Sequence, residues 1–279
     1  MFETVYGFGA GVYFIGYFLF EVPSNMVLAR VGARLWMARI MLTWGVISCL
    51  FMFLGDFRWG GMAQALNLTD AEFGFYLLRF LLGVAEAGFY PGVILYLTYW
   101  FPTSRRAGVI ALFMTAVGVS SVIGAPLSGA ILQFADGLLS LRGWQWLFLL
   151  EGLPSVLTGF AFLIMLPDRP SDAKWLTPAE AAAVTADIQM EDRRRSQATL
   201  VSAGHAFTSL RIWIFALSFM SGTIAIYAVS FWIPTIVQSL GIPPGDYFRV
   251  GLLSMIPWTV MIIMQVLWGR NSDRTRERR

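Results

Sequence analysis

The stretch FGFYLLRFLLGVAEAGFYPGVILYL, residues Phe73–Leu97, decides the fold class of this chain. A helix needs about 20 mainly apolar residues to cross ~30 Å of hydrocarbon, and this stretch is longer than that. Only two of its residues, Arg79 and Glu86, are charged. The stretch therefore predicts a membrane-spanning helix that carries two charges inside the membrane.

Six further stretches have the same apolar character. Together they predict seven spans: Val5–Leu28, Trp36–Gly55, Phe73–Leu97, Ala107–Phe134, Trp144–Leu166, Ile212–Val237 and Phe248–Trp268. The whole chain is 57% hydrophobic and 13% charged, whereas a soluble domain has roughly 25% charged residues. We therefore expect an all-α membrane protein.

Basic residues lie mainly on one side of the predicted spans. The segments after the first, third, fifth and seventh spans, together with Arg39 at the mouth of the second span, hold 16 of the 20 Lys and Arg residues. Cytoplasmic loops carry the excess of basic residues, so Met1 is expected outside and Arg279 inside. The first stretch is too long and lacks the basic start of a cleavable signal peptide. An outside N-terminus without a signal suggests a missing upstream helix, and we interpret the chain as a piece of a longer protein.

The longest polar stretch, Asp168–Arg211, separates five spans from two. Within it, Thr177-Pro178-Ala179-Glu180 has the form of a capping box with proline at the first helical position, which predicts a short helix through Arg194. We expect an N-terminal helical bundle at residues 1–167, a central cytoplasmic loop at 168–211 and the start of a second bundle at 212–279.

Several classes of protein are disfavoured by residue types that occur only once. Cys49 has no partner cysteine, and His205 is the only histidine, which argues against disulfides and clustered metal sites. An intramembrane hydrolase would need a base near Ser128, but His205 lies in the cytoplasmic segment. Retinal attachment needs a lysine in the last helix, and the only lysine is Lys174. We expect no enzyme activity, no cofactor, no metal and no nucleic-acid partner.

Arg79 and Glu86 form the candidate site. Seven residues make nearly two helical turns, so both side chains share one face about 10.5 Å apart, with Gly83 between them. Intramembrane charges are costly and mark functional sites by default. The arginine can bind a carboxylate bidentately, and desolvation favours the protonated form of Glu86. The alternative is that each charge only fixes helix packing.

Two other intramembrane charges stand out as candidates, Glu21 and Glu151. Glu21 precedes Pro23, and Tyr17 one turn earlier can donate a hydrogen bond into a polar cavity or can simply pack as an aromatic. For Glu151, beside Pro154, a structural role such as capping a broken helix is the favoured interpretation.

These residues also carry a resemblance. Arg79–Gly92, RFLLGVAEAGFYPG, followed by Trp100-Phe101-Pro102 and Arg105-Arg106, resembles the fourth helix and next loop of the anion:cation symporters, a branch of the major facilitator superfamily. Phe20–Asn25 (FEVPSN) and Leu166–Pro170 (LPDRP), the latter followed by Trp175-Leu176-Thr177, look most like its bacterial tartrate transporter-like members. Such transporters have twelve helices in two bundles. The resemblance implies that the seven spans are helices two to eight and that residues 1–167 lack the first helix of their bundle.

A loop motif occurs twice, as the resemblance implies. The first copy runs from Asn25 to Arg34 and the second starts at Gly269. Their gating residues would be Arg30, Gly32, Arg34, Gly269, Asp273 and Arg274. The first copy departs from the pattern, because Asn25 replaces a glycine and Ala29 stands where an acid is usual. The second copy has Arg276 where glycine is common.

The resemblance also implies roles in a site. Arg79 would bind substrate, Glu86 would couple protons, and Tyr17 and more weakly Tyr227 would contact substrate. We therefore predict a secondary transporter in the cell inner membrane, monomeric, that moves a small organic anion such as tartrate together with a proton. A seven-helix receptor or another non-transporter membrane protein is the alternative.

Overall fold

The computed structural model describes residues 3–196 and 208–275, and these residues form helices and connecting loops without strands. The α-helices are α1 (Glu3–Val31), α2 (Ala33–Leu50), α3 (Gly61–Ala65), α4 (Asp70–Glu86), α5 (Phe89–Thr98), α6 (Thr103–Phe134), α7 (Gly143–Met165), α8 (Pro178–Ser196), α10 (Leu210–Ser239) and α11 (Tyr247–Thr275). Short 3-10 helices are η1 (Phe51–Phe53), η2 (Leu138–Ser140) and η3 (Pro170–Asp172). The predicted all-α fold class is confirmed.

Seven stretches of the described chain are long and apolar enough to cross a membrane. They are Thr4–Val31, Ala33–Phe53, Asp70–Thr98, Arg105–Phe134, Gly143–Met165, Leu210–Ser239 and Tyr247–Trp268. Each overlaps one of the predicted spans, so the number and order of the spans were correct from the sequence.

The third span differs from the prediction, because it is two helices and not one. α4 ends at Glu86, and α5 begins at Phe89. Between them Ala87 has a ψ of 126° and Gly88 a φ of +85°. A side chain at Gly88 would lie 2.5 Å from the hydroxyl of Ser24, so both the left-handed conformation and the space require glycine. Pro91 falls in the first turn of α5, where its missing N–H costs nothing.

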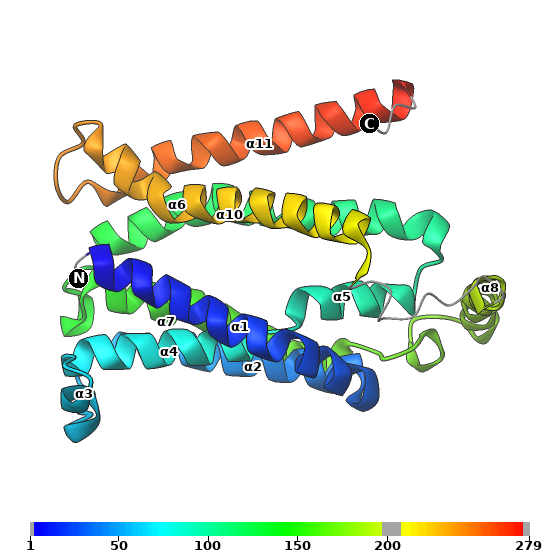
Figure 1. Cartoon of the computed structure of the whole chain (residues 1–279), viewed down its shortest axis with the longest axis horizontal. Coiled ribbons are helices and arrows are strands. Elements are labelled where there is room, and N and C mark those ends of the chain that lie inside the picture. Colours follow the sequence, from blue (N-terminus) through cyan, green and yellow to red (C-terminus); the bar gives the residue numbers. More distant parts are fainter. Residues whose placement is uncertain (1–2, 197–207, 276–279) are drawn as a thin grey trace. The chain divides into compact units, whose positions relative to one another are not determined.

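The first compact unit comprises residues 1–107 and 135–188, with α1, α2, α4, α5 and α7. α1 packs against α4, and α2 packs against both α4 and α7 (Figure 1). Glycines allow the close contacts: Gly16 and Gly83 between α1 and α4, and Gly45, Gly152 and Gly159 between α2 and α7. Small residues of this kind let membrane helices approach to backbone contact.

The second compact unit comprises residues 108–134 and 189–279, with α6, α10 and α11. α6 meets α11 where Gly129 touches the backbone of Tyr247 and Gly251 touches the backbone of Ala125. Gln133 accepts a hydrogen bond from the Phe248 amide at 2.9 Å. These contacts group α6 with α10 and α11, whereas the sequence placed it in a bundle at 1–167. The predicted bundle boundaries are not tested by this grouping and stay a prediction.

The predicted capping box begins α8. Glu180 accepts hydrogen bonds from the backbone N–H and the hydroxyl of Thr177, both at 2.8 Å. These bonds hold the pKa of the Glu180 carboxyl below its usual range. The predicted helix end at Arg194 lies two residues before the observed end at Ser196. His205 lies outside the described residues.

Candidate functional site

Arg79 lies in the third turn of α4, which a Thr69–Glu72 capping box starts. Its guanidinium carbon is 5.1 Å from the ring centre of Phe75, 5.8 Å from that of Phe51 and 5.9 Å from that of Tyr6. Among the described residues it has no carboxylate within 4.0 Å, and its buried Nε has no hydrogen-bond partner. Aromatic faces attract a cation but leave its N–H groups unused. Arg79 is therefore available to an anion.

Glu86 is the last residue of α4 and has a different partner. The hydroxyl of Tyr13 on α1 donates a hydrogen bond to its Oε2 at 2.6 Å. The backbone carbonyl of Tyr13 touches Gly83, one turn before Glu86 on α4. This backbone contact fixes the distance between the hydroxyl and the carboxyl group. The sequence reasoning missed Tyr13.

Two pairs of side chains connect α1 to α4: Tyr6 with Arg79, and Tyr13 with Glu86. α1 and α4 run in the same direction, side by side (Figure 1). Tyr6 and Tyr13 on α1 are seven residues apart, as are Arg79 and Glu86 on α4. Tyr6 therefore meets Arg79 at one level and Tyr13 meets Glu86 two turns later. The equal spacing was the signal in the sequence that pointed to these tyrosines, but it does not fix which tyrosine of α1 meets Glu86.

The other two predicted substrate contacts, Tyr17 and Tyr227, belong to neither of these pairs. Tyr17 lies one turn beyond Tyr13 on α1, with its ring centre 6.1 Å from that of Tyr13. Tyr227 is on α10 in the second compact unit, with its ring stacked on Phe231 at 6.0 Å. The substrate-binding roles of Tyr17 and Tyr227 stay predictions.

The first copy of the loop motif joins α1 to α2. Gly32 has a φ of +97° and precedes α2 without a side-chain cap of its own. Instead, Asp168, which follows α7, accepts a hydrogen bond from the Arg34 amide at 2.8 Å. Arg30 is exposed in the last turn of α1. Asp168 was missed, because no local pattern connects positions 134 residues apart.

The second copy of the motif lies at the end of α11. Gly269, Asp273 and Arg274 all fall within this helix. Their side chains are outside the part that the structure describes, so the gating roles of both copies stay predictions.

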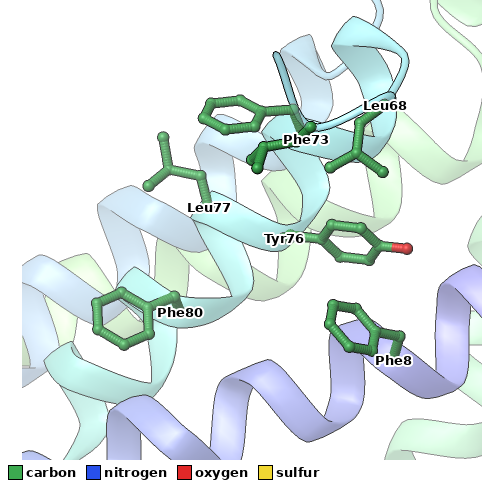
Figure 2. A pocket seen from close by; sticks show the side chains of 7 residues that line it. Phe8, Leu68, Phe73, Tyr76, Leu77 and Phe80 are labelled. Carbon is green, nitrogen blue, oxygen red and sulfur yellow. The ribbon is translucent and has the colours of Figure 1, made fainter. Parts of the chain in front are cut away.

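An apolar groove between α1 and α4 is separate from these charges. It encloses about 510 Å³ and is lined by Phe8, Leu66, Leu68, Phe73, Tyr76, Leu77 and Phe80. Figure 2 shows Phe8 of α1 facing Tyr76 of α4 across it. Neither Arg79 nor Glu86 lines the groove. Its lining is largely apolar and includes no positively charged side chain to bind an organic anion.

Comparison with known proteins assigns the family. The sequence profile of the Major Facilitator Superfamily matches residues 3–279. The chain belongs to this superfamily.

Relatives narrow the assignment. A protein of Agrobacterium vitis named as a tartrate transporter is 44% identical over 277 residues, which are 99% of this chain and 57% of the relative. A metabolite transport protein of Pseudomonas putida, NicT, is 44% identical over 99% of this chain and 59% of its own length. The inner membrane transport protein RhmT of Escherichia coli is 32% identical, with 99% and 60% covered. The resemblance to tartrate transporter-like members is confirmed, and the chain spans about three fifths of these relatives.

Proposed function

We propose that this chain is part of a secondary transporter that moves a small organic anion, of the class of tartrate, together with a proton. The observation that carries the proposal is a half-buried arginine whose buried Nε–H has no partner, two turns from a carboxyl group on the same helix face. Such a cation needs an anion, and guanidinium binds carboxylates in a fixed bidentate geometry. The relatives named for tartrate and metabolite transport support the substrate class.

The two charged residues have different roles. Arg79 binds the carboxylate of the substrate, while Glu86 takes up and releases the proton. An ionised Glu86 repels a bound anion, and its protonation removes that repulsion. Binding of the anion and of the proton thereby favour each other, which is the thermodynamic requirement for moving both in the same direction.

The remaining predicted roles belong to the same proposal. Tyr17 and Tyr227 contact the substrate, and the two loop motifs gate access at Arg30, Gly32, Arg34, Gly269, Asp273 and Arg274. Residues 1–167 form one bundle and residues 212–279 begin a second, joined by the loop at 168–211. The protein acts as a monomer in the cell inner membrane, where its relative RhmT is placed by name.

The test uses a chimera in which this chain replaces the matching residues of the 44% identical Agrobacterium vitis relative. Purified chimera in proteoliposomes is given tartrate under an inward proton gradient. We expect accumulation by the chimera, no tartrate binding by Arg79→Ala, and exchange without accumulation by Glu86→Gln. Gly11→Ala, at a position of α1 with open space around it, is the control and should accumulate tartrate like the parent.

Two results would contradict the proposal. The first is a folded chimera that moves no organic anion while the unaltered relative does. The second is full accumulation by both charge variants, because Arg79 and Glu86 would then be packing elements.

A further inference from the structure

The break between α4 and α5 is held from two sides. On the α1 side, Gly88 packs against Ser24 and Asn25, whose side-chain atoms lie 2.5 and 3.2 Å from where a Cβ would be. On the α2 side, Arg39 donates to the backbone carbonyl of Ala85 at 3.5 Å, the long end of the hydrogen-bonding range. Ala85 and Ala87 are buried, so the end of α4 is shielded from bulk solvent.

Arg39 is a second half-buried cation, and the mechanism proposed above does not use it. Its guanidinium carbon lies 4.0 Å over the ring of Trp36, and its buried Nε has no partner. Among the described residues, no carboxylate lies within 4.0 Å of it. The indole of Trp36 donates to Ser24 at 2.9 Å and so connects this part of α2 to α1.

The position of Arg39 suits a specific task. The last carbonyl groups of a helix lack intrahelical partners and carry the negative end of the helix dipole. A cation placed there stabilises the helix end. The carbonyl that Arg39 contacts belongs to the residue just before Glu86, while Tyr13 contacts the Glu86 carboxyl from α1. α4 is therefore held at its end by one group from α2 and one from α1.

We propose that Arg39 is a positioning residue for the proton step: by binding the end of α4 at Ala85, it keeps the Glu86 carboxyl where Tyr13 reaches it. The inference rests on the proposed function, because it takes Glu86 as the proton carrier. The break at Ala87–Gly88 confines any change of backbone direction to the residues directly after Glu86. Without Arg39, the end of α4 is free to move with this joint.

The test compares three variants of the chimera in proteoliposomes. Arg39→Met fills the space with an apolar side chain. It loses the long hydrogen bond to Ala85 but also removes a buried Nε donor that has no partner, so we expect the two effects to offset each other and the Tm not to fall. Arg39→Lys keeps a cation that can reach a carbonyl. Trp36→Phe is the matched control, because it removes the Ser24 hydrogen bond in the same cluster and leaves a ring under Arg39. Tartrate accumulation under a proton gradient, tartrate exchange without a gradient, KM and Tm are measured for each.

We expect accumulation to fall at least tenfold relative to exchange in Arg39→Met, with KM within twofold and Tm not lowered. Arg39→Lys should stay within about threefold of the parent ratio, and Trp36→Phe should keep the ratio even where its Tm falls. A stable Arg39→Met with the parent ratio would overturn the inference. So would a loss in Arg39→Met that only follows a lowered Tm, because Arg39 would then be a packing element. The parent chimera and Glu86→Gln are measured alongside. If the parent does not accumulate tartrate, or if Glu86→Gln does, the proposed function itself fails, and this result is distinct from failure of the inference about Arg39.

Discussion

Replacing Glu86 by glutamine should tighten anion binding by an amount that the helix geometry sets. Arg79 and Glu86 are seven residues apart on α4, which places an anion on the arginine about 10 Å from the carboxyl group. Two unit charges at that distance repel each other by about 1.6 kcal/mol at an effective dielectric constant of about 20. Glutamine removes this repulsion and imitates the protonated acid. At a pH where Glu86 is ionised, the tartrate Kd should therefore fall roughly tenfold.

The assay is tartrate binding by isothermal titration calorimetry to the purified chimera in nanodiscs, over a series of pH values. The parent should bind more tightly as the pH falls, whereas Glu86→Gln should bind tightly throughout and lose most of the pH dependence. Gly11→Ala on the neighbouring helix, with open space around it, is the control that leaves both charges in place. If the Kd of Glu86→Gln equals that of the parent at every pH, the two sites are not coupled through charge and the mechanism is wrong.

Three further predictions concern stability. Tyr13→Phe removes a hydrogen bond to a carboxylate and should cost about 1.5–3 kcal/mol when Glu86 is ionised. In a Glu86→Gln background the amide oxygen accepts only a neutral hydrogen bond, so a double-mutant cycle of unfolding free energies should show the cost fall to about 0.5–1.5 kcal/mol. Gly83→Ala places a methyl group against the Tyr13 carbonyl and should cost about 1–3 kcal/mol by overpacking, whereas Gly11→Ala on α1, with open space around it, should change Tm little. The lowered pKa of Glu180 stabilises the start of α8 above the unfolded value of about 4.3. Amide protection factors there, which are corrected for the intrinsic exchange rate at each pH, should therefore fall as pH falls through the lower folded value, and Glu180→Gln should abolish that pH dependence.

The spans and the two intramembrane charges could be predicted, because each depends on local information. A run of apolar residues identifies a span by itself, and a spacing of seven puts Arg79 and Glu86 on one face. The break after Glu86 was not predicted. Glycine and proline are tolerated within membrane helices, so Gly88 and Pro91 do not by themselves indicate a break. The left-handed conformation of Gly88 and its contact with Ser24, which together require glycine, are evident only from the structure.

Partners between helices could not be predicted in the same way. Tyr13 and Tyr17 lie one turn apart on α1 and have the same chemistry, so the choice between them depends on the axial register of α1 against α4. That register is set by the contact of Gly83 with the Tyr13 backbone. Asp168 reaches the start of α2 from 134 residues away, and nothing in its neighbourhood indicates this.

The matched spacing on α1 and α4 has a consequence for how this part of the protein can vary. Between Arg79 and Glu86, a substitution changes one side chain, but an inserted or deleted residue turns everything after it by about 100° around the helix axis. The Glu86 carboxyl would then no longer face the Tyr13 hydroxyl, although both residues would still be present. The same holds for the segment of α1 between Tyr6 and Tyr13. Over these two segments the number of residues is constrained more strongly than their identity, so homologues should differ here in composition and agree in length.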